Sequence, residues 1–178
     1  YLLDSGEGLT LVDGGLPGDA NRILDQMRKA DRALSDLRRI VVTHGHGDHV
    51  GGVAELVARS GAEVMAHREE VPFIEQTGSL PATSFVQRLL NWVSHRLVFN
   101  TEPCEVDRVV EDGDAIEALD GLRVIHAPGH TPGSIALFQP ERGILFCGDA
   151  LFNANPMGGE PGLRLPIRLF TLDGEQAR

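Results

Sequence analysis

The chain has 178 residues, of which 42% are hydrophobic, enough for one domain with a core but too few for two ordinary domains. The formal net charge is −10. So acidic a surface repels nucleic-acid phosphates. No apolar run reaches the roughly 18 residues that a membrane helix needs, so nucleic acids and membranes are not expected as partners. The two cysteines, Cys104 and Cys147, provide no disulfide framework and predict a reducing compartment, the cytoplasm.

Strands and helices alternate in the first half of the chain. Apolar runs at 1–4 and 9–13, joined by the turn sequence SGEG, predict a hairpin. Helical spacing of apolar residues and β-branched runs predict the next elements. These are a helix over 20–30, a strand over 37–43, a helix over 50–61, a strand over 62–66, and helical stretches over 67–76 and 84–97.

The second half contains short strands separated by glycine- and proline-rich turns. The expected strands cover 106–110, 115–119, 122–127, 134–139 and 143–149. Strand–helix units followed by a β-meander indicate two packed sheets with helices outside. We find no repeat and no linker, so residues 1–178 are expected to form one domain.

Four side chains of metal-ligand type lie within six residues, directly after the strand predicted over 37–43. They are His44, His46, Asp48 and His49, and imidazole and carboxylate groups bind divalent zinc, iron or manganese. An extended turn would send the first two imidazoles to one side. The intervening glycines leave space for a metal ion.

Four segments of the chain, in order, resemble those of the metallo-β-lactamase superfamily. They are LTLVDGG at 9–15, THGHGDH at 43–49, APGHTPGS at 127–134 and FCGDALF at 146–152. The resemblance implies an α/β fold, an αββα sandwich. Because the chain begins within a strand and has no histidine after His130, we expect it to be cut short slightly at its N-terminus and more at its C-terminus.

The resemblance also implies a site for two divalent metal ions, with zinc favoured and iron or manganese as alternatives. The first ion would be bound by His44, His46 and His130. The second would be bound by Asp48, His49 and Asp149, with Asp149 bridging both. The family adds a histidine near its C-terminus, which would lie beyond Arg178. Asp13, at the end of a predicted strand, is expected to orient a ligating imidazole without binding a metal ion itself.

Two such ions can share a water and lower its pKa towards ~7, which supplies a hydroxide nucleophile. Asp48 could orient it and accept its proton. The resemblance is to the glyoxalase II-like and lactonase-like branches, which implies hydrolysis of a small ester, thioester or lactone. The alternatives are a mononuclear iron enzyme that oxidises persulfides and a non-catalytic metal-binding module.

Two arginines and three further histidines lie outside the four matched segments. Arg164 and Arg168 could recognise an anionic group of the substrate, although solvated arginines on a loop are the alternative. His67 is expected on the surface at the start of a helix, His95 is expected to be structural, and His126 is not expected to be a ligand.

Overall fold

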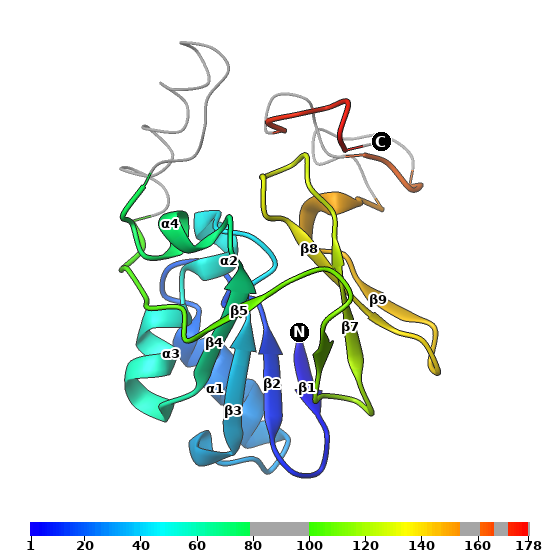
Figure 1. Cartoon of the computed structure of the whole chain (residues 1–178). Coiled ribbons are helices and arrows are strands. Elements are labelled where there is room, and N and C mark those ends of the chain that lie inside the picture. The colour runs from blue at the N-terminus through cyan, green and yellow to red at the C-terminus, as the bar shows by residue number, and fades with distance from the viewer. Residues whose placement is uncertain (79–99, 154–160, 166–170, 178) are drawn as a thin grey trace.

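The computed structural model describes residues 1–78, 100–153, 161–165 and 171–177. These residues form two sheets, of five and four strands. Helices α1 and α3 cover the outer face of the larger sheet, and the smaller sheet packs on its other face (Figure 1). The described layers therefore follow the order helix, sheet, sheet, in agreement with the predicted α/β fold.

The larger sheet has the strand order β1-β2-β3-β4-β5. Its strands are β1 (Leu2–Asp4), β2 (Leu9–Val12), β3 (Leu37–Val41), β4 (Glu63–His67) and β5 (Arg108–Val110). The first two strands form the antiparallel hairpin that the turn sequence predicts, and the remaining neighbours are parallel. Parallel strands place their carboxyl ends at one edge, so residues that follow β2, β3 and β4 lie near one another.

Alternating burial explains why these runs form strands between two apolar layers. Ile40 and Val64 face the helices, whereas the adjacent Val41 and Met65 face the smaller sheet. Since successive side chains of a strand point to opposite faces, a continuous apolar run fits a sheet that is covered on both sides.

The helices end close to the predicted positions. The described helical segments are α1 (Ala20–Lys29), η1 (Leu34–Asp36), α2 (Gly47–Val50), α3 (Val53–Ser60) and α4 (Val71–Ile74). Leu24 and Met27 of α1 and Leu56 of α3 are buried against the sheet. Gly61 ends α3 in the left-handed conformation, with φ 70°. The helix predicted over 50–61 is interrupted near Gly51, and the one predicted over 67–76 is shorter than expected.

The smaller sheet has the order β6-β7-β8-β9 and is antiparallel throughout. Its strands are β6 (Ala115–Ile116), β7 (Leu122–His126), β8 (Ile135–Gln139) and β9 (Ile144–Phe146), followed by the 3-10 turn η3 (Gly148–Ala150). The predicted meander is correct for these four strands. The strand predicted over 106–110 instead becomes β5, which joins the larger sheet beside β4.

The amphipathic stretch at 84–97 and Arg168 lie outside the described residues. Within the described ranges, no helix has the length and apolar character needed to cross a membrane. A backbone hydrogen bond from Ile135 to the carbonyl of Thr43, 3.0 Å long, connects the two sheets at the carboxyl end of β3. The histidine-rich turn begins there.

Candidate metal centre

The first group of candidate ligands comes from the turn that follows β3. His44 is buried, with 1% of its surface exposed. His46 is extended, with φ −73° and ψ 148°, and directly precedes α2. Asp48 and His49 lie within α2. This change from extended to helical backbone explains how four side chains so close in sequence can address different sides of one small volume.

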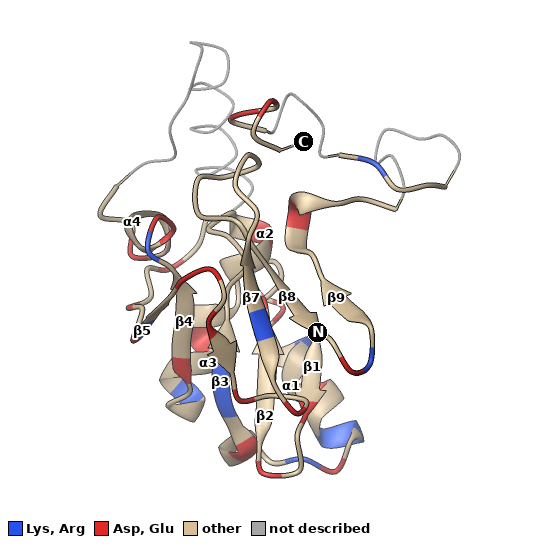
Figure 2. Cartoon of the chain, turned by 45° about the vertical axis from the view of Figure 1, so that its right-hand side comes forward, with Lys and Arg blue, Asp and Glu red and all other residues tan. Residues whose placement is uncertain are grey.

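The second group comes from the smaller sheet. His130 is buried in the connection between β7 and β8, and Asp149 lies in η3 after β9. Figure 2 shows acidic positions on α2 and on the turn after β9, which lie towards the same end of the two sheets. The two sheets therefore contribute ligand-type residues to a common edge.

Residues that are far apart in the sequence converge at this edge. Candidate ligand atoms of His44, His46 and His130 lie within 4.8 Å of one another, and those of His44, His49 and Asp149 do so as well. Nδ1 of His46 is 2.9 Å from Nε2 of His130. Asp149 reaches both groups, with one oxygen 3.3 Å from Nε2 of His49 and the other 3.5 Å from Nε2 of His130.

The donor set fits a divalent cation. Nε2 of His44 is buried, and no hydrogen-bond partner for it is found among the described residues. A buried nitrogen without a partner is costly, and coordination would remove that cost. Nitrogen atoms around a tetrahedral zinc ion are about 3.3 Å apart when each bond is about 2.0–2.1 Å long, so the 2.9 Å separation of the His46 and His130 nitrogens requires only a small adjustment.

Three of the histidines are held in the neutral form that coordination requires. Burial lowers the pKa of His44 far below its ordinary value and also lowers that of His46. Burial, with the neighbouring His46, lowers the pKa of His130 to about 4. At neutral pH these imidazoles therefore keep a free lone pair.

His49 differs because carboxylates lie on both sides of its ring. Burial opposes charge on this imidazole, but hydrogen bonds with Asp13 and Asp149 outweigh that effect and raise its pKa to about 10. His49 in turn lowers the pKa of Asp149 against the effect of burial. A cation on Nε2 of His49 would displace the proton that these carboxylates favour.

Asp13 directly follows β2, and its carboxylate forms hydrogen bonds with three groups. One oxygen is 2.9 Å from Nδ1 of His49, and the other accepts the backbone N–H of Thr43 at 2.8 Å. The Thr43 hydroxyl donates to the same carboxylate and lies 3.2 Å from Nδ1 of His44. Asp13 thus contacts both the His49 ring and the backbone of Thr43, and the orienting role that the sequence analysis assigns to it stays a prediction.

Asp48 lies at the edge of the cluster. Its side chain is 44% exposed, and one oxygen is 3.9 Å from Nε2 of His49. Neither of the two close groups of candidate ligands includes it. Arg164 is exposed, and its backbone forms two hydrogen bonds with the backbone of Phe152. Its role in substrate recognition stays a prediction.

Glu70 is a participant that the sequence analysis missed. Its carboxylate accepts the backbone N–H groups of Gly45 and Gly133, one from each ligand-bearing turn. In the sequence it is the second of two adjacent glutamates. No local pattern distinguishes it from Glu69, so only the folded arrangement reveals its contacts.

A further group of metal-ligand type, His67, Glu69 and His126, lies near Glu70. The two imidazole rings are stacked at 4.1 Å and 14°, so their in-plane lone pairs do not converge on one point. Nε2 of His126 lies 2.9 Å from the carbonyl oxygen of Pro132. The geometry fits a packing role. His67 is buried at the end of β4, so its predicted surface position is wrong.

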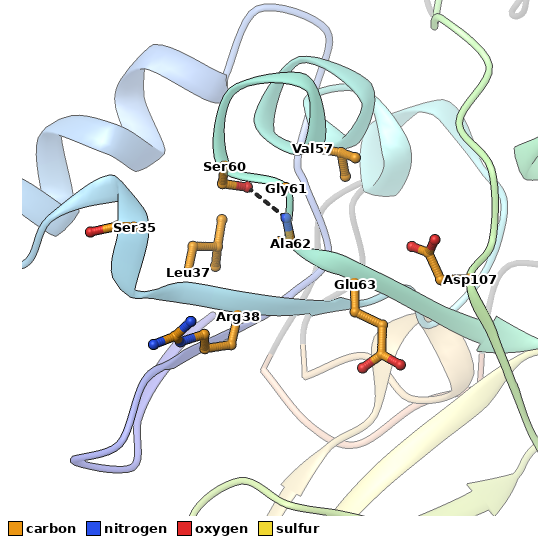
Figure 3. A pocket seen from close by; sticks show the side chains of 9 residues that line it. All are labelled: Ser35, Leu37, Arg38, Val57, Ser60, Gly61, Ala62, Glu63 and Asp107. Carbon is orange, nitrogen blue, oxygen red and sulfur yellow. Dashed lines mark hydrogen bonds between the residues drawn. The ribbon is translucent and has the colours of Figure 1, made fainter.

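A hollow of about 580 Å³ lies at the opposite end of the strands, between η1, α3 and the start of β4 (Figure 3). Its Ser60 hydroxyl is already used by the local backbone, because it donates to Leu56 and accepts from Ala62. None of the residues that line the hollow is a candidate ligand, so it is separate from the ligand cluster.

Comparison with known proteins agrees with this geometry. A sequence model of the metallo-β-lactamase superfamily matches residues 1–174, so the chain belongs to that superfamily. Solved structures with a similar fold include BJP-1, a subclass B3 metallo-β-lactamase of Bradyrhizobium japonicum, with TM-score 0.66 and 27% identity over 90% of this chain and 60% of that one. The di-zinc class B3 enzyme LRA-12 from an Alaskan soil metagenome has TM-score 0.64 and 29% identity over 77% of this chain and 48% of that one.

Similar proteins also include hydrolases with other names. The probable metallo-hydrolase YflN of Bacillus subtilis is 29% identical over 94% of this chain and 67% of its own length. A hydroxyacylglutathione hydrolase of Pseudomonas aeruginosa is 37% identical over 78% of this chain and 42% of its own length. The chain thus spans from less than half to about two thirds of these relatives.

Proposed function

We propose that this chain is the metal-binding part of a hydrolase that acts on a small ester, thioester or lactone. The observation that carries the proposal is the convergence of His44, His46 and His130 from two different sheets, with a buried, unpartnered Nε2 on His44. Packing alone does not require three neutral imidazoles with their nitrogens turned towards one point.

Each candidate ligand has a role in the proposal. His44, His46 and His130 would hold one divalent cation, while His49, Asp48 and Asp149 would hold a second, with Asp149 between the two. Zinc is the cation favoured by a set of imidazoles and carboxylates, and iron or manganese would also suit it. Bound cations of this kind supply a water of lowered pKa and polarise the oxygen of the substrate carbonyl.

The protein's own side chains would then accept the proton of the attacking water and keep the ligands oriented. Asp48, at the exposed edge of the cluster, can accept the proton of the attacking water and pass it to solvent or to the leaving group. Asp13 holds the His49 ring through Nδ1, which leaves Nε2 directed into the site. His44 and His130 are themselves buried, with 1% and 3% of their surfaces exposed, so their imidazoles have little contact with bulk water.

The substrate class rests on the relatives and on the residues around the cluster. A hydroxyacylglutathione hydrolase from Pseudomonas aeruginosa is among the similar proteins. Residues 153–166, NANPMGGEPGLRLP, do not resemble the GCGR-like stretch that follows this aspartate in glyoxalase II-type proteins. We therefore propose small esters, thioesters and lactones as the substrate class, without requiring a glutathione moiety.

The proposal is tested by metal analysis and turnover together. Zn²⁺-loaded protein is expected to hydrolyse members of a panel of thioesters and lactones, and the substitutions His46→Ala and Asp149→Ala are expected to abolish both metal retention and turnover. Asp25→Asn, an exposed change on α1, is the matched control. Equal turnover by the metal-free chain would contradict the proposal. Oxygen uptake with a persulfide by iron-loaded protein, without hydrolysis, would replace it with the iron-enzyme alternative.

A further inference from the structure

A fully buried carboxylate lies between the two ligand-bearing turns without being part of the candidate ligand set. Glu70 has 0% of its surface exposed. Its backbone is fixed at the start of α4, because its N–H donates to the carbonyl of His67 and its own carbonyl accepts the N–H groups of Phe73 and Ile74. No cationic side chain pairs with it among the described residues.

The two oxygens of Glu70 bond to different turns. Oε2 accepts the backbone N–H of Gly45 at 2.6 Å, and Gly45 separates His44 from His46. Oε1 accepts the backbone N–H of Gly133 at 2.8 Å, three residues after His130. One rigid, planar group therefore connects the turn of the larger sheet to the turn of the smaller sheet.

The glycines at both ends of this connection support its importance. A Cβ on Gly45 would lie 2.9 Å from Cβ of Phe73 and 3.1 Å from Oε2 of Glu70. A Cβ on Gly133 would lie 2.9 Å from Cγ and N of Glu70 and from Nδ1 of His67. Neither glycine has a positive φ, so close approach to the Glu70 segment, rather than an unusual backbone angle, requires a residue without a side chain at both positions.

A buried carboxylate is costly unless hydrogen bonds satisfy it. Burial raises the pKa of Glu70, while hydrogen bonds from Thr131, Gly45 and Gly133 favour its charged form. An apolar side chain could fill the same volume without that cost. The charge and the two acceptors are therefore used for something other than packing.

We infer that Glu70 is a positioning residue that fixes the spacing between the His44–His46 turn and the His130 turn, and so sets the geometry in which both bind a single cation. The inference rests on the metal site of the proposed function. Glu70 itself does not contact the cation; it acts through the two backbone amides. Loss of one of its acceptors would release one turn, and the three imidazoles would have to be reordered on binding.

The test uses Co²⁺ as a spectroscopic probe and Zn²⁺ in competition with a chelating dye, on wild-type protein and the variant Glu70→Gln. Glutamine keeps the shape but replaces one acceptor oxygen with a donor. The expected result is a 10–100-fold weaker affinity, the range typical when a supporting partner of a ligand is lost, together with an altered Co²⁺ absorption spectrum. In the metal-free state, the amides of Gly45 and Gly133 are expected to exchange their hydrogens faster.

Glu69→Gln is the matched control, because it makes the same chemical change at the adjacent, half-exposed carboxylate. Its affinity and spectrum should equal those of the wild type. If Glu70→Gln does not fold, Glu70→Asp serves instead, since it retains the charge but shortens the reach to the two amides, and its affinity should also fall.

The outcomes separate the two claims. A folded Glu70 variant with wild-type affinity, spectrum and amide exchange would overturn the inference and leave the proposed function intact. Wild-type protein that fails to bind Co²⁺ or Zn²⁺ would contradict the proposed function, and the inference would fall with it.

Discussion

Asp13 shows how much of the site depends on a single residue outside the candidate ligands. Its carboxylate bonds to the Thr43 backbone, the Thr43 hydroxyl and the His49 ring. Its backbone adopts φ 62°, a conformation that aspartate and asparagine tolerate better than most residues. The residue type therefore suits both the backbone and the side-chain contacts at this position.

We predict that Asp13→Asn folds but binds Zn²⁺ about 10–100-fold more weakly, because asparagine retains the backbone conformation and loses the charge that orients His49. Competition with a chelating dye measures the change, and Asp25→Asn is the control for loss of one negative charge. Unchanged affinity in Asp13→Asn would show that the carboxylate is not needed to orient the ligand.

The pH dependence of stability in the metal-free protein should reveal His49. Its pKa is raised to about 10 in the folded state, against an ordinary value of 6.5. Between these values the folded chain binds more protons than the unfolded one, so this residue's contribution to the free energy of unfolding falls as pH rises. Urea unfolding in chelator at pH 6.5–9 should show a fall that His49→Gln reduces. Equal slopes for both proteins would refute this assignment.

The local residue pattern singles out the turn at 43–49, whereas His130 and Asp149 are expected only from the resemblance to the superfamily; the structure brings five of the six expected ligands into two close groups, which do not include Asp48. The pattern does not identify Glu70. That residue's contacts involve backbone amides 25 and 63 residues away, and an acidic residue near a helix start usually has a local explanation. The sequence analysis explains Gly45 only by the space that it leaves for a metal ion. The structure shows a second reason, because this glycine lies close to Phe73 and Glu70.

At the scale of elements, α3 connects the ligand turn to the core. Leu56 is fully buried against the sheet, and Gly61 ends the helix in the left-handed conformation, where a Cβ would meet no other atom within 4 Å. The end of the helix therefore depends on backbone conformation alone.

Gly61→Ala is expected to lower the free energy of unfolding by about 1 kcal/mol, the cost of placing a Cβ in the left-handed region. Gly61→Asn should cost less, because asparagine tolerates this conformation. Urea denaturation of the two variants provides the comparison. If Gly61→Asn lowers the free energy of unfolding as much as Gly61→Ala or more, side-chain crowding rather than the backbone angle determines the cost of a side chain at this position.

The sequence predicts the strand over 106–110 but not the sheet that this strand joins. Its apolar character correctly predicts a strand, but it precedes the meander by only a short turn. Its pairing with β4 is parallel and non-local. Which sheet accepts an edge strand depends on the whole assembly rather than on the strand's own pattern. The bounds of α1 (Ala20–Lys29), by contrast, lie within one residue of the predicted 20–30, because helical spacing and start signals are local.

At the scale of the whole molecule, the candidate ligands join the two sheets. His44, His46 and His49 follow the larger sheet, and His130 and Asp149 follow the smaller one. A ligand that binds only the folded state stabilises it by mass action. A cation held by both sheets should therefore stabilise the molecule as a whole.

Removal of metal is expected to lower the thermal midpoint by about 5–10 °C, which corresponds to free Zn²⁺ at about 100 times its Kd for a chain of this size. Scanning calorimetry with and without chelator measures the shift, and His46→Ala should be insensitive to the chelator. A midpoint of the wild-type chain that does not respond to the chelator would argue against a cation shared by the two sheets.

The most direct measurement is an anomalous difference map from crystals grown with stoichiometric Zn²⁺ and collected on either side of the zinc absorption edge. The account predicts a peak bounded by Nε2 of His44, Nδ1 of His46 and Nε2 of His130, with Asp149 beside it. Zinc bound elsewhere on the protein, with no peak among these nitrogens, would contradict it.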